Sequence, residues 1–210
     1  MSAGRPLRLI VFAKPPLRGH VKTRLARRIG HRAATSVYRV LLADTLMRLS
    51  LVPVASLELC ASGRRHPSLW SLARRAGAEY RLQGHGDLGQ RMQRATARAL
   101  SDGFSPVIVG ADCAGVSAVH VGAAFDALDD GADAVFAPAD DGGYALIGLS
   151  RPLPGLFHRM PWGMPAVMAR TRRRLAAQGL CWRELPGAWD VDDWRSLRRW
   201  RRERCDGGWR

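Results

Sequence analysis

Two lysines stand out among the cationic residues of this chain. It contains 33 Lys and Arg residues, but only Lys14 and Lys22 are lysines, and both lie in one stretch with Arg18 and Arg24. A lysine carries a compact, mobile positive charge, and the free N–H groups at the start of a helix also favour anions. The stretch therefore predicts a phosphate-binding loop. The plainer alternative is a solvated loop that holds both lysines by chance.

Carboxylates at two places predict a site for a divalent cation. Asp112 closely follows the apolar segment 106–110, and Asp190 and Asp192 lie two residues apart, so they point the same way if that segment is extended. Carboxylate oxygens are ligands that Mg²⁺ prefers. Each acid also has a plainer role, because Asp112 could cap a following turn and Asp192 or Asp193 could cap the last helix.

Two glycine-containing stretches could approach a ligand closely. The first, 83–92, has the sequence QGHGDLGQRM, and Asp87 within it could cap the following helix. The second, 139–144, has the sequence ADDGGY. Because Asp-Gly is a strong turn signal, this second stretch could also be a simple hairpin turn.

Alternating strands and helices must position these residues. Apolar runs predict strands at 9–13, 54–60, 78–82, 106–110, 134–138, 144–149 and 181–185. Helical spacing predicts helices at 33–49, 68–76, 87–100, 117–128, 165–177 and 194–205. The alternation predicts an α/β fold with a mostly parallel sheet and helices on both faces, and ligands bind such sheets at the carboxyl ends of the strands. With no linker or repeat, residues 1–210 are expected to form a single domain.

Composition narrows the classes of partner. The net charge of +15 would attract nucleic acid, but the arginines are scattered and no recognition motif is found, so we predict no specific nucleic-acid partner. No apolar run approaches the roughly 20 residues of a membrane span, and no signal-peptide core is found, so we expect a cytoplasmic protein. The four widely spaced cysteines predict buried free thiols. The sequence leaves open whether the protein forms a homodimer.

Five motifs occur along the chain in a characteristic order: FAKPPLRGHVKTRLA, QGHGDLGQRM, IVGADCAG, APADDGGYALIGL and DVDDW. Together they resemble a family of small bacterial transferases related to the GT-A glycosyltransferases, of the arsenosugar-biosynthesis or radical-SAM-associated type. The resemblance covers nearly the whole chain and implies the three-layer nucleotide-diphospho-sugar transferase (GT-A-like) fold. Ala111 and Ala114 depart from the family's usual GTDCP motif, and Asp193 departs from its usual DVDT.

The resemblance also implies roles for individual residues. The residues expected to contact the nucleotide are Ala13, Lys14, Arg18, Gly19, Gln83, Gly84 and Asp87. Lys22 and Arg24 would hold its phosphates, and Asp141 is the candidate catalytic base. The residues expected to bind Mg²⁺ or Mn²⁺ are Asp112, Asp190 and Asp192. The sugar or acceptor pocket would be formed by Gly142, Gly143, Tyr144 and Trp162.

The implied activity is metal-dependent transfer of a sugar from a nucleoside-diphosphate sugar to a small-molecule acceptor. A second activity stays open, because KTRLA also resembles the KSRLA motif of phospholactate and phosphoenolpyruvate guanylyltransferases, and the fold relates to molybdenum-cofactor nucleotidyltransferases. Such an enzyme would release pyrophosphate from a nucleoside triphosphate. The Leu-Ala-Gly-Gly signature of sugar nucleotidyltransferases is absent after the first strand. A binding protein or an enzyme that has lost activity is the third alternative.

Overall fold

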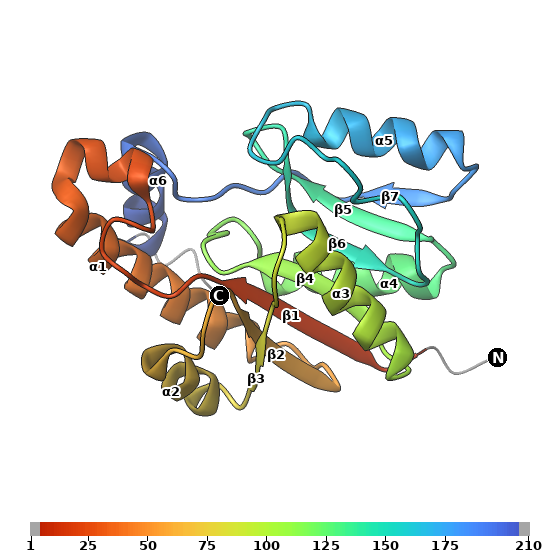
Figure 1. Ribbon diagram of the computed structural model, residues 1–210, viewed down its shortest axis with the longest axis horizontal. Coiled ribbons are helices and arrows are strands. Elements are labelled where there is room, and N and C mark those ends of the chain that lie inside the picture. The colour runs from red at the N-terminus through yellow and green to blue at the C-terminus, as the bar shows by residue number, and fades with distance from the viewer. Residues whose placement is uncertain (1–4, 206–210) are drawn as a thin grey trace.

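The computed structural model describes residues 5–205. Within them, one mixed sheet has the strand order β3-β2-β1-β4-β6-β5-β7 (Figure 1). Its strands are β1 (Leu7–Ala13), β2 (Ser56–Ala61), β3 (Glu79–Leu82), β4 (Ser105–Gly110), β5 (Ala134–Pro138), β6 (Tyr144–Leu149) and β7 (Trp182–Glu184). Strand β6 runs antiparallel to β4 and β5, and the other neighbouring pairs are parallel. The predicted mostly parallel sheet is confirmed.

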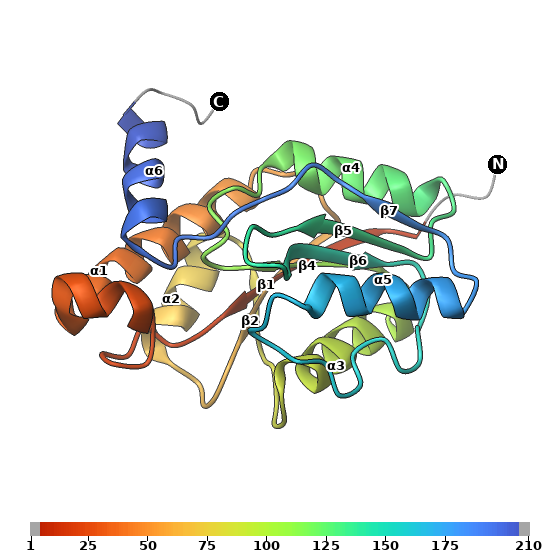
Figure 2. The same ribbon diagram turned by 90° about the horizontal axis from the view of Figure 1, so that it is seen from above.

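Helices cover both faces of this sheet (Figure 2). They are α1 (Thr23–Leu49), α2 (Pro67–Arg75), α3 (Leu88–Ser101), α4 (Ala118–Asp129), α5 (Val167–Ala177) and α6 (Trp194–Cys205). One hydrophobic cluster joins α1, α2 and α4 to the sheet, and a second joins α3 and α5 to the opposite face. The α/β/α layering of the predicted fold is therefore confirmed.

Strand β1 shows why its sequence is apolar throughout. Leu9 and Val11 pack in the cluster with α1, whereas Ile10 packs on the other face against Met92 of α3, and all three strand residues are completely buried. A central parallel strand is covered on both sides, so it carries a continuous hydrophobic run instead of an alternating pattern. This packing fixes the end of β1, from which the phosphate-loop candidate leaves.

The stretch 139–143 connects the antiparallel strands β5 and β6, so the alternative of a hairpin turn is confirmed. The expected start of a helix in the stretch with Lys22 and Arg24 is confirmed too, since α1 begins at Thr23. Two expectations need correction. The helix expected at 33–49 is only the second part of α1, which Gly30 interrupts with a non-helical backbone (φ 80°, ψ 155°). Only Cys60 and Cys113 are buried thiols, since Cys181 lies just before the short edge strand β7 and Cys205 lies in the last turn of α6. None of the described helices is long and apolar enough to cross a bilayer.

The segment between β7 and α6, residues 185–193, returns along the carboxyl end of the sheet. Ala188 N–H donates to the Pro138 carbonyl at 2.8 Å, and Val191 N–H donates to the Asp112 carbonyl at 3.3 Å. Ribbon views show this segment passing from β7 across to α6, which lies beside α1 (Figures 1 and 2). The backbone pairing therefore brings Asp190 and Asp192 to the end of β4, although about 80 residues separate them in sequence.

Candidate functional site

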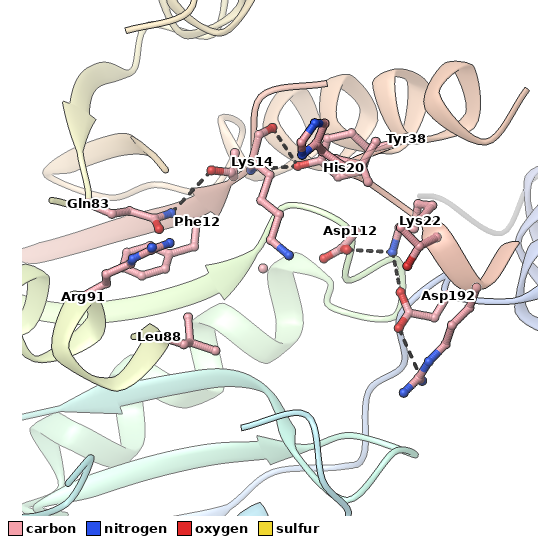
Figure 3. A pocket seen from close by; sticks show the side chains of 15 residues that line it. Phe12, Lys14, His20, Lys22, Tyr38, Gln83, Leu88, Arg91, Asp112 and Asp192 are labelled. Carbon is pink, nitrogen blue, oxygen red and sulfur yellow. Dashed lines mark hydrogen bonds and ion pairs between the residues drawn. The ribbon is translucent and has the colours of Figure 1, made fainter. Parts of the chain in front are cut away.

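A polar cavity of about 550 Å³ lies at the carboxyl ends of β1 and β4. We call it the donor cavity, after the ligand that we propose for it below. Its lining residues are Phe12, Ala13, Lys14, His20, Val21, Lys22, Thr23, Arg24, Tyr38, Gln83, Leu88, Arg91, Gly110, Asp112 and Asp192 (Figure 3). The side chain of Lys14 extends into it from the end of β1, and Lys22, Asp112 and Asp192 cluster at one side. The fold thus gathers residues from β1, α1, α3, β4 and the 185–193 segment around one space.

Lys22 is the centre of this cluster. Its Nζ lies 2.6 Å from Asp112 Oδ2 and 2.8 Å from Asp192 Oδ1, and its side chain is only 2% exposed. The residue immediately precedes α1 with a left-handed backbone (φ 48°, ψ 46°), which is uncommon for a residue with a side chain. Burial on its own would lower the pKa of Lys22, but the two carboxylates outweigh it and raise the pKa above its usual value. The ammonium group therefore stays charged.

The other cations of the donor cavity are less constrained. Arg24 is 62% exposed and lies 3.8 Å from Asp192 Oδ2, which is a loose ion pair. Sequence patterns did not reveal the contributions of His20 and Arg91, which face the same space. Arg91 lies in the first turn of α3, close to the Asp87 cap. This closeness to the start of the helix is the one sequence signal that could have indicated that Arg91 faces the site. The cavity is thus lined by cations from both sides.

Polar contacts hold the end of β1 in place. The Tyr38 hydroxyl accepts a hydrogen bond from Lys14 N–H (2.9 Å) and donates one to the Lys14 carbonyl (3.0 Å). The buried Gln83 amide donates to the carbonyls of Cys60 (2.8 Å) and Ala13 (3.4 Å). Tyr38 comes from the middle of α1, where no motif pointed to it. Tyr38 and Gln83 thus hold the backbone at Ala13 and Lys14, which lines the cavity.

Several predicted nucleotide contacts lie away from the donor cavity. Arg18, Gly19, Gly84 and Asp87 are not among its lining residues, whereas Ala13, Lys14 and Gln83 are. Asp87 forms a capping box with Gln90 at the start of α3, so its expected role as a helix cap is confirmed. Contact between these four residues and a nucleotide stays a prediction.

Three carboxylates surround Lys22, and their charges differ. The pKa of Asp190 rises to about 7, first because of burial and then because of the neighbouring Asp192 and Asp112. Burial also acts to raise the pKa of Asp112, but Lys22 outweighs it and lowers that pKa. Asp193 accepts from Ser196 N–H at 2.8 Å, so Asp193, not Asp192, caps α6. Asp192 is left to face the cavity.

The chemical type of these side chains, carboxylates, suits a hard divalent cation. Asp112, Asp190 and Asp192 offer carboxylate oxygens, and the raised pKa of Asp190 indicates negative charge that Lys22 does not fully compensate. In the arrangement seen here, with Lys22 between two of the acids, no three His, Cys, Asp or Glu side chains within residues 5–205 come close enough together to hold a metal ion. Binding a cation among these three acids would therefore require side-chain movement.

A second cavity, of about 270 Å³, adjoins the first. We call it the acceptor cavity, again after the ligand that we propose for it below. It shares Phe12, Leu88, Gly110 and Asp112 with the donor cavity and extends over Asp141, Gly143, Tyr144, Trp162 and Asp190. The rings of Tyr144 and Trp162 meet edge to face, with centroids 6.3 Å apart. The two cavities meet at Asp112.

The hairpin loop shapes this acceptor cavity. Asp141 Oδ1 accepts from Gly143 N–H at 2.9 Å, which leaves its other oxygen without a partner in the described chain. Gly142 has φ +84°, and a Cβ there would lie 2.3 Å from the Pro165 carbonyl oxygen, so only glycine fits. Gly142 does not line the cavity itself, so it shapes the cavity only through the backbone conformation of the loop.

Comparison with solved structures supports a transferase-like fold. A protein of Desulfovibrio desulfuricans G20, provisionally assigned as a nucleotide-diphospho-sugar transferase, is 31% identical over 89% of this chain and 82% of its own, with a TM-score of 0.80. Two further structures share the fold at lower identity. CMP:2-keto-3-deoxy-manno-octonic acid synthetase complexed with CTP is 11% identical over 96% of this chain and 99% of its own (TM-score 0.59). Rv0371c of Mycobacterium tuberculosis H37Rv in complex with manganese is 20% identical over 94% of this chain and 98% of its own (TM-score 0.54).

Comparison at the level of sequence families gives the assignment. A search of curated proteins found no match. The model of a family described as uncharacterized proteins conserved in bacteria, DUF2064, matches residues 45–164, which is more than half of the chain and includes Asp112, Asp141 and Trp162. This match shows that the chain belongs to the DUF2064 family.

Proposed function

We propose that this chain is a metal-dependent glycosyltransferase that moves a sugar from a nucleoside-diphosphate sugar to a small acceptor. The observation that carries the proposal is the meeting of two cavities of different character at Asp112. The larger one is lined by cations and the smaller one by aromatic side chains and Asp141. A donor with a charged diphosphate and an acceptor with a hydroxyl need these two environments side by side. The narrower assignment to the arsenosugar-biosynthesis or radical-SAM-associated type is part of the same proposal.

The donor cavity would hold the nucleoside diphosphate. Its volume of about 550 Å³ lies within the roughly 300–1,000 Å³ of typical ligand sites. Lys14 and Arg24 face the space where a diphosphate would lie, and Lys22 would offer its buried charge to the leaving phosphate. A positive charge that is already positioned stabilises negative charge as it develops. Ala13 and Gln83 would line the nucleoside end.

The three acids near Lys22 would hold the cation. Asp112, Asp190 and Asp192 carry the oxygen ligands that Mg²⁺ and Mn²⁺ take. When bound, the cation would supply Lewis-acid stabilisation of the leaving diphosphate. The protein's own part is to offer these carboxylates from two segments that backbone pairing holds together, while Lys22 forms ion pairs with two of them, Asp112 and Asp192, in the arrangement seen here.

The acceptor cavity would orient the attacking hydroxyl. The acceptor oxygen would form a bond to the anomeric carbon, and the bond from that carbon to the diphosphate oxygen would break, with its electron pair leaving on the nucleoside diphosphate. In an inverting reaction, the free oxygen of Asp141 would take the hydroxyl proton. Tyr144 and Trp162 would pack against the sugar or the acceptor.

Nucleotidyl transfer is the competing function, and the cationic lining of the donor cavity is compatible with it. Lys14, Lys22, Arg24 and Arg91 all line the donor cavity, and such cationic side chains bind the oxygens of a triphosphate as well as those of a diphosphate. An acceptor phosphate would then attack the α-phosphorus, and pyrophosphate would leave. The same residues would serve both reactions, so the product distinguishes them.

A product assay tests the proposal. The purified protein is incubated with Mn²⁺ and either UDP-, GDP- or CDP-sugars or the matching triphosphates, and released nucleoside diphosphate or pyrophosphate is measured. We expect slow release of nucleoside diphosphate from one donor, abolished in Asp112→Asn and unchanged in Asp126→Asn, an exposed aspartate on α4. Release of pyrophosphate alone would replace glycosyl transfer by nucleotidyl transfer. Equal activity of Asp112→Asn and the parent protein would contradict the proposed site.

A further inference from the structure

A third cavity, also of about 550 Å³, opens beside the two that meet at Asp112. We call it the α6 groove. Helix α6 contributes Arg195, Ser196, Arg199 and Arg202 to its lining. The groove shares Arg24 and Asp192 with the donor cavity, and Asp141 and Asp190 with the acceptor cavity. A ligand in the groove would therefore reach both the candidate base and the candidate metal ligands.

Helix α6 presents one stripe of arginines to this groove. Arg195, Arg199 and Arg202 are spaced by four and three residues, which places them on one face of a helix, while Leu197 and Trp200 are buried on another face. Arg199 is held in place, since its guanidinium lies 4.2 Å from the centre of the Trp189 ring and its Nε donates to Glu203 at 2.9 Å. The stripe is thus a defined wall of the groove.

The plainer explanation is that these arginines only neutralise the nearby aspartates. The contacts account for part of the stripe: Arg199 lies 4.0 Å from Asp140, and the charge of Arg195 contributes to lowering the pKa of Asp193. They do not account for Arg202, which forms no ion pair with any residue in 5–205. Arg24, 62% exposed, has only the loose contact with Asp192. The guanidinium groups of Arg202 and Arg24 thus have capacity for another anion.

We propose that the α6 groove binds an anionic group, a phosphate or a carboxylate, on the acceptor substrate. This inference rests on the proposed function and names its acceptor class: a molecule that places a hydroxyl near Asp141 and an anionic group against Arg195 and Arg202. Guanidinium groups hold phosphate and carboxylate oxygens with two parallel hydrogen bonds, which gives orientation as well as affinity. The groove would orient the acceptor while the acids act at its other end.

A matched pair of variants tests the groove. Arg195→Gln/Arg202→Gln removes two arginines that face it, and Arg198→Gln/Arg201→Gln removes two exposed arginines of the same helix that do not. Both doubles lose the same charge, so general electrostatic attraction changes equally. The protein is first saturated with whichever of UDP, GDP and CDP it binds, in the presence of Mn²⁺, so that phosphate probes cannot enter the donor cavity.

The probes are glycerol 3-phosphate, glycerate and glycerol, which differ in their charged end, titrated by calorimetry. Vesicles of phosphatidylcholine with and without phosphatidic acid test a lipid headgroup as the source of the phosphate. We expect an anionic probe to bind about tenfold more weakly to the groove double than to the parent, as loss of charge-assisted hydrogen bonds predicts. The control double should change affinity by less than about twofold, in keeping with the small effect of removing charges that make no direct contact.

The outcomes separate this inference from the function on which it rests. Failure of every nucleoside diphosphate to bind the parent refutes the proposed function. Nucleotide binding combined with equal losses in both doubles, or with no preference for the anionic probes over glycerol and no preference for phosphatidic acid in vesicles, refutes the groove alone. Vesicle binding without binding of the soluble probes supports the groove and assigns the phosphate to a lipid.

Discussion

Replacing Lys22 by methionine should cost stability in a way that depends on pH. The substitution keeps an unbranched apolar stem but removes the ammonium group that lies 2.6 Å and 2.8 Å from two carboxylates. Breaking a fully buried ion pair costs roughly 3–5 kcal/mol, and an exposed pair contributes about 0–1 kcal/mol. Because Lys22 is buried while Asp112 and Asp192 are 33% and 38% exposed, we expect an intermediate loss of about 2 kcal/mol at pH 7. For a chain of this length, that loss corresponds to a fall in Tm of about 4–8 °C.

The pH dependence follows from the lowered pKa of Asp112. A carboxylate whose pKa is lower in the folded state stabilises the fold above its unfolded pKa, and this contribution is lost as the pH falls through the folded value. Without Lys22 the contribution disappears, so the difference between the parent and Lys22→Met should be largest near pH 7 and should shrink below about pH 4, the ordinary pKa range of an aspartate.

Urea unfolding followed by tryptophan fluorescence at pH 7 and pH 3.5 measures this difference. Lys14→Met is the matched control, because Lys14 is the other lysine of the chain and forms no ion pair with a described residue. It should lose less than about 0.5 kcal/mol, as surface substitutions usually do. Equal losses in the two variants, or a loss in Lys22→Met that is the same at both pH values, would refute the electrostatic role assigned to Lys22.

Three further changes probe the fold around the site. Arg98→Met should lower the free energy of unfolding in urea by about 3–4 kcal/mol, because it leaves the completely buried Glu58 carboxylate without the guanidinium that contacts both of its oxygens. Glu58→Met/Arg98→Met should lose less, and a larger loss in this double variant would contradict the role of the ion pair. Gly142→Ala should lower Tm more than Gly131→Ala. Both glycines have positive φ, but only a Cβ at position 142 would lie 2.3 Å from a backbone oxygen. Equal falls in Tm would show that the backbone conformation, and not this clash, determines the loss. Asp87→Ala should lower the free energy of unfolding by about 1 kcal/mol through loss of its helix cap, and no loss in urea unfolding would contradict that role. The nucleotide affinity of the same variant tests the separate prediction that Asp87 contacts the nucleotide.

The sequence predicted the layers of this fold because hydrophobic periodicity reports local structure directly. It also predicted that Asp112 follows the carboxyl end of an apolar strand, which the structure confirms, and binding of a ligand there stays a prediction. The sequence did not predict that the helix starting near Lys22 and the helix at 33–49 form one element, α1, because Gly30 interrupts the helix between the two segments. The antiparallel direction of β6 depends on the short hairpin at 139–143, whose turn signal was visible in the sequence.

The partners of Lys22 could not be predicted from the sequence in the same way. The sequence indicated that Lys22 would hold phosphates, whereas the structure pairs it with Asp112 and Asp192, respectively 90 and 170 residues further along the chain. That pairing depends on the return of segment 185–193 along the sheet, a tertiary contact with no local signal. Tyr38 and Arg91 were missed for the same reason, because each reaches the cavity from a helix whose orientation only packing determines.

The central claim is that Asp112 lies where a metal-dependent nucleotide site meets an acceptor site. Isothermal titration of the parent and Asp112→Asn with UDP, GDP and CDP and the matching triphosphates, each with and without Mn²⁺, tests it most directly. We predict that one nucleoside diphosphate binds the parent with an affinity that Mn²⁺ increases at least about tenfold, a gain of about 1.4 kcal/mol, and that Asp112→Asn loses this increase. Nucleotide binding that is indifferent to both Mn²⁺ and the substitution, or no nucleotide binding at all, would contradict the account.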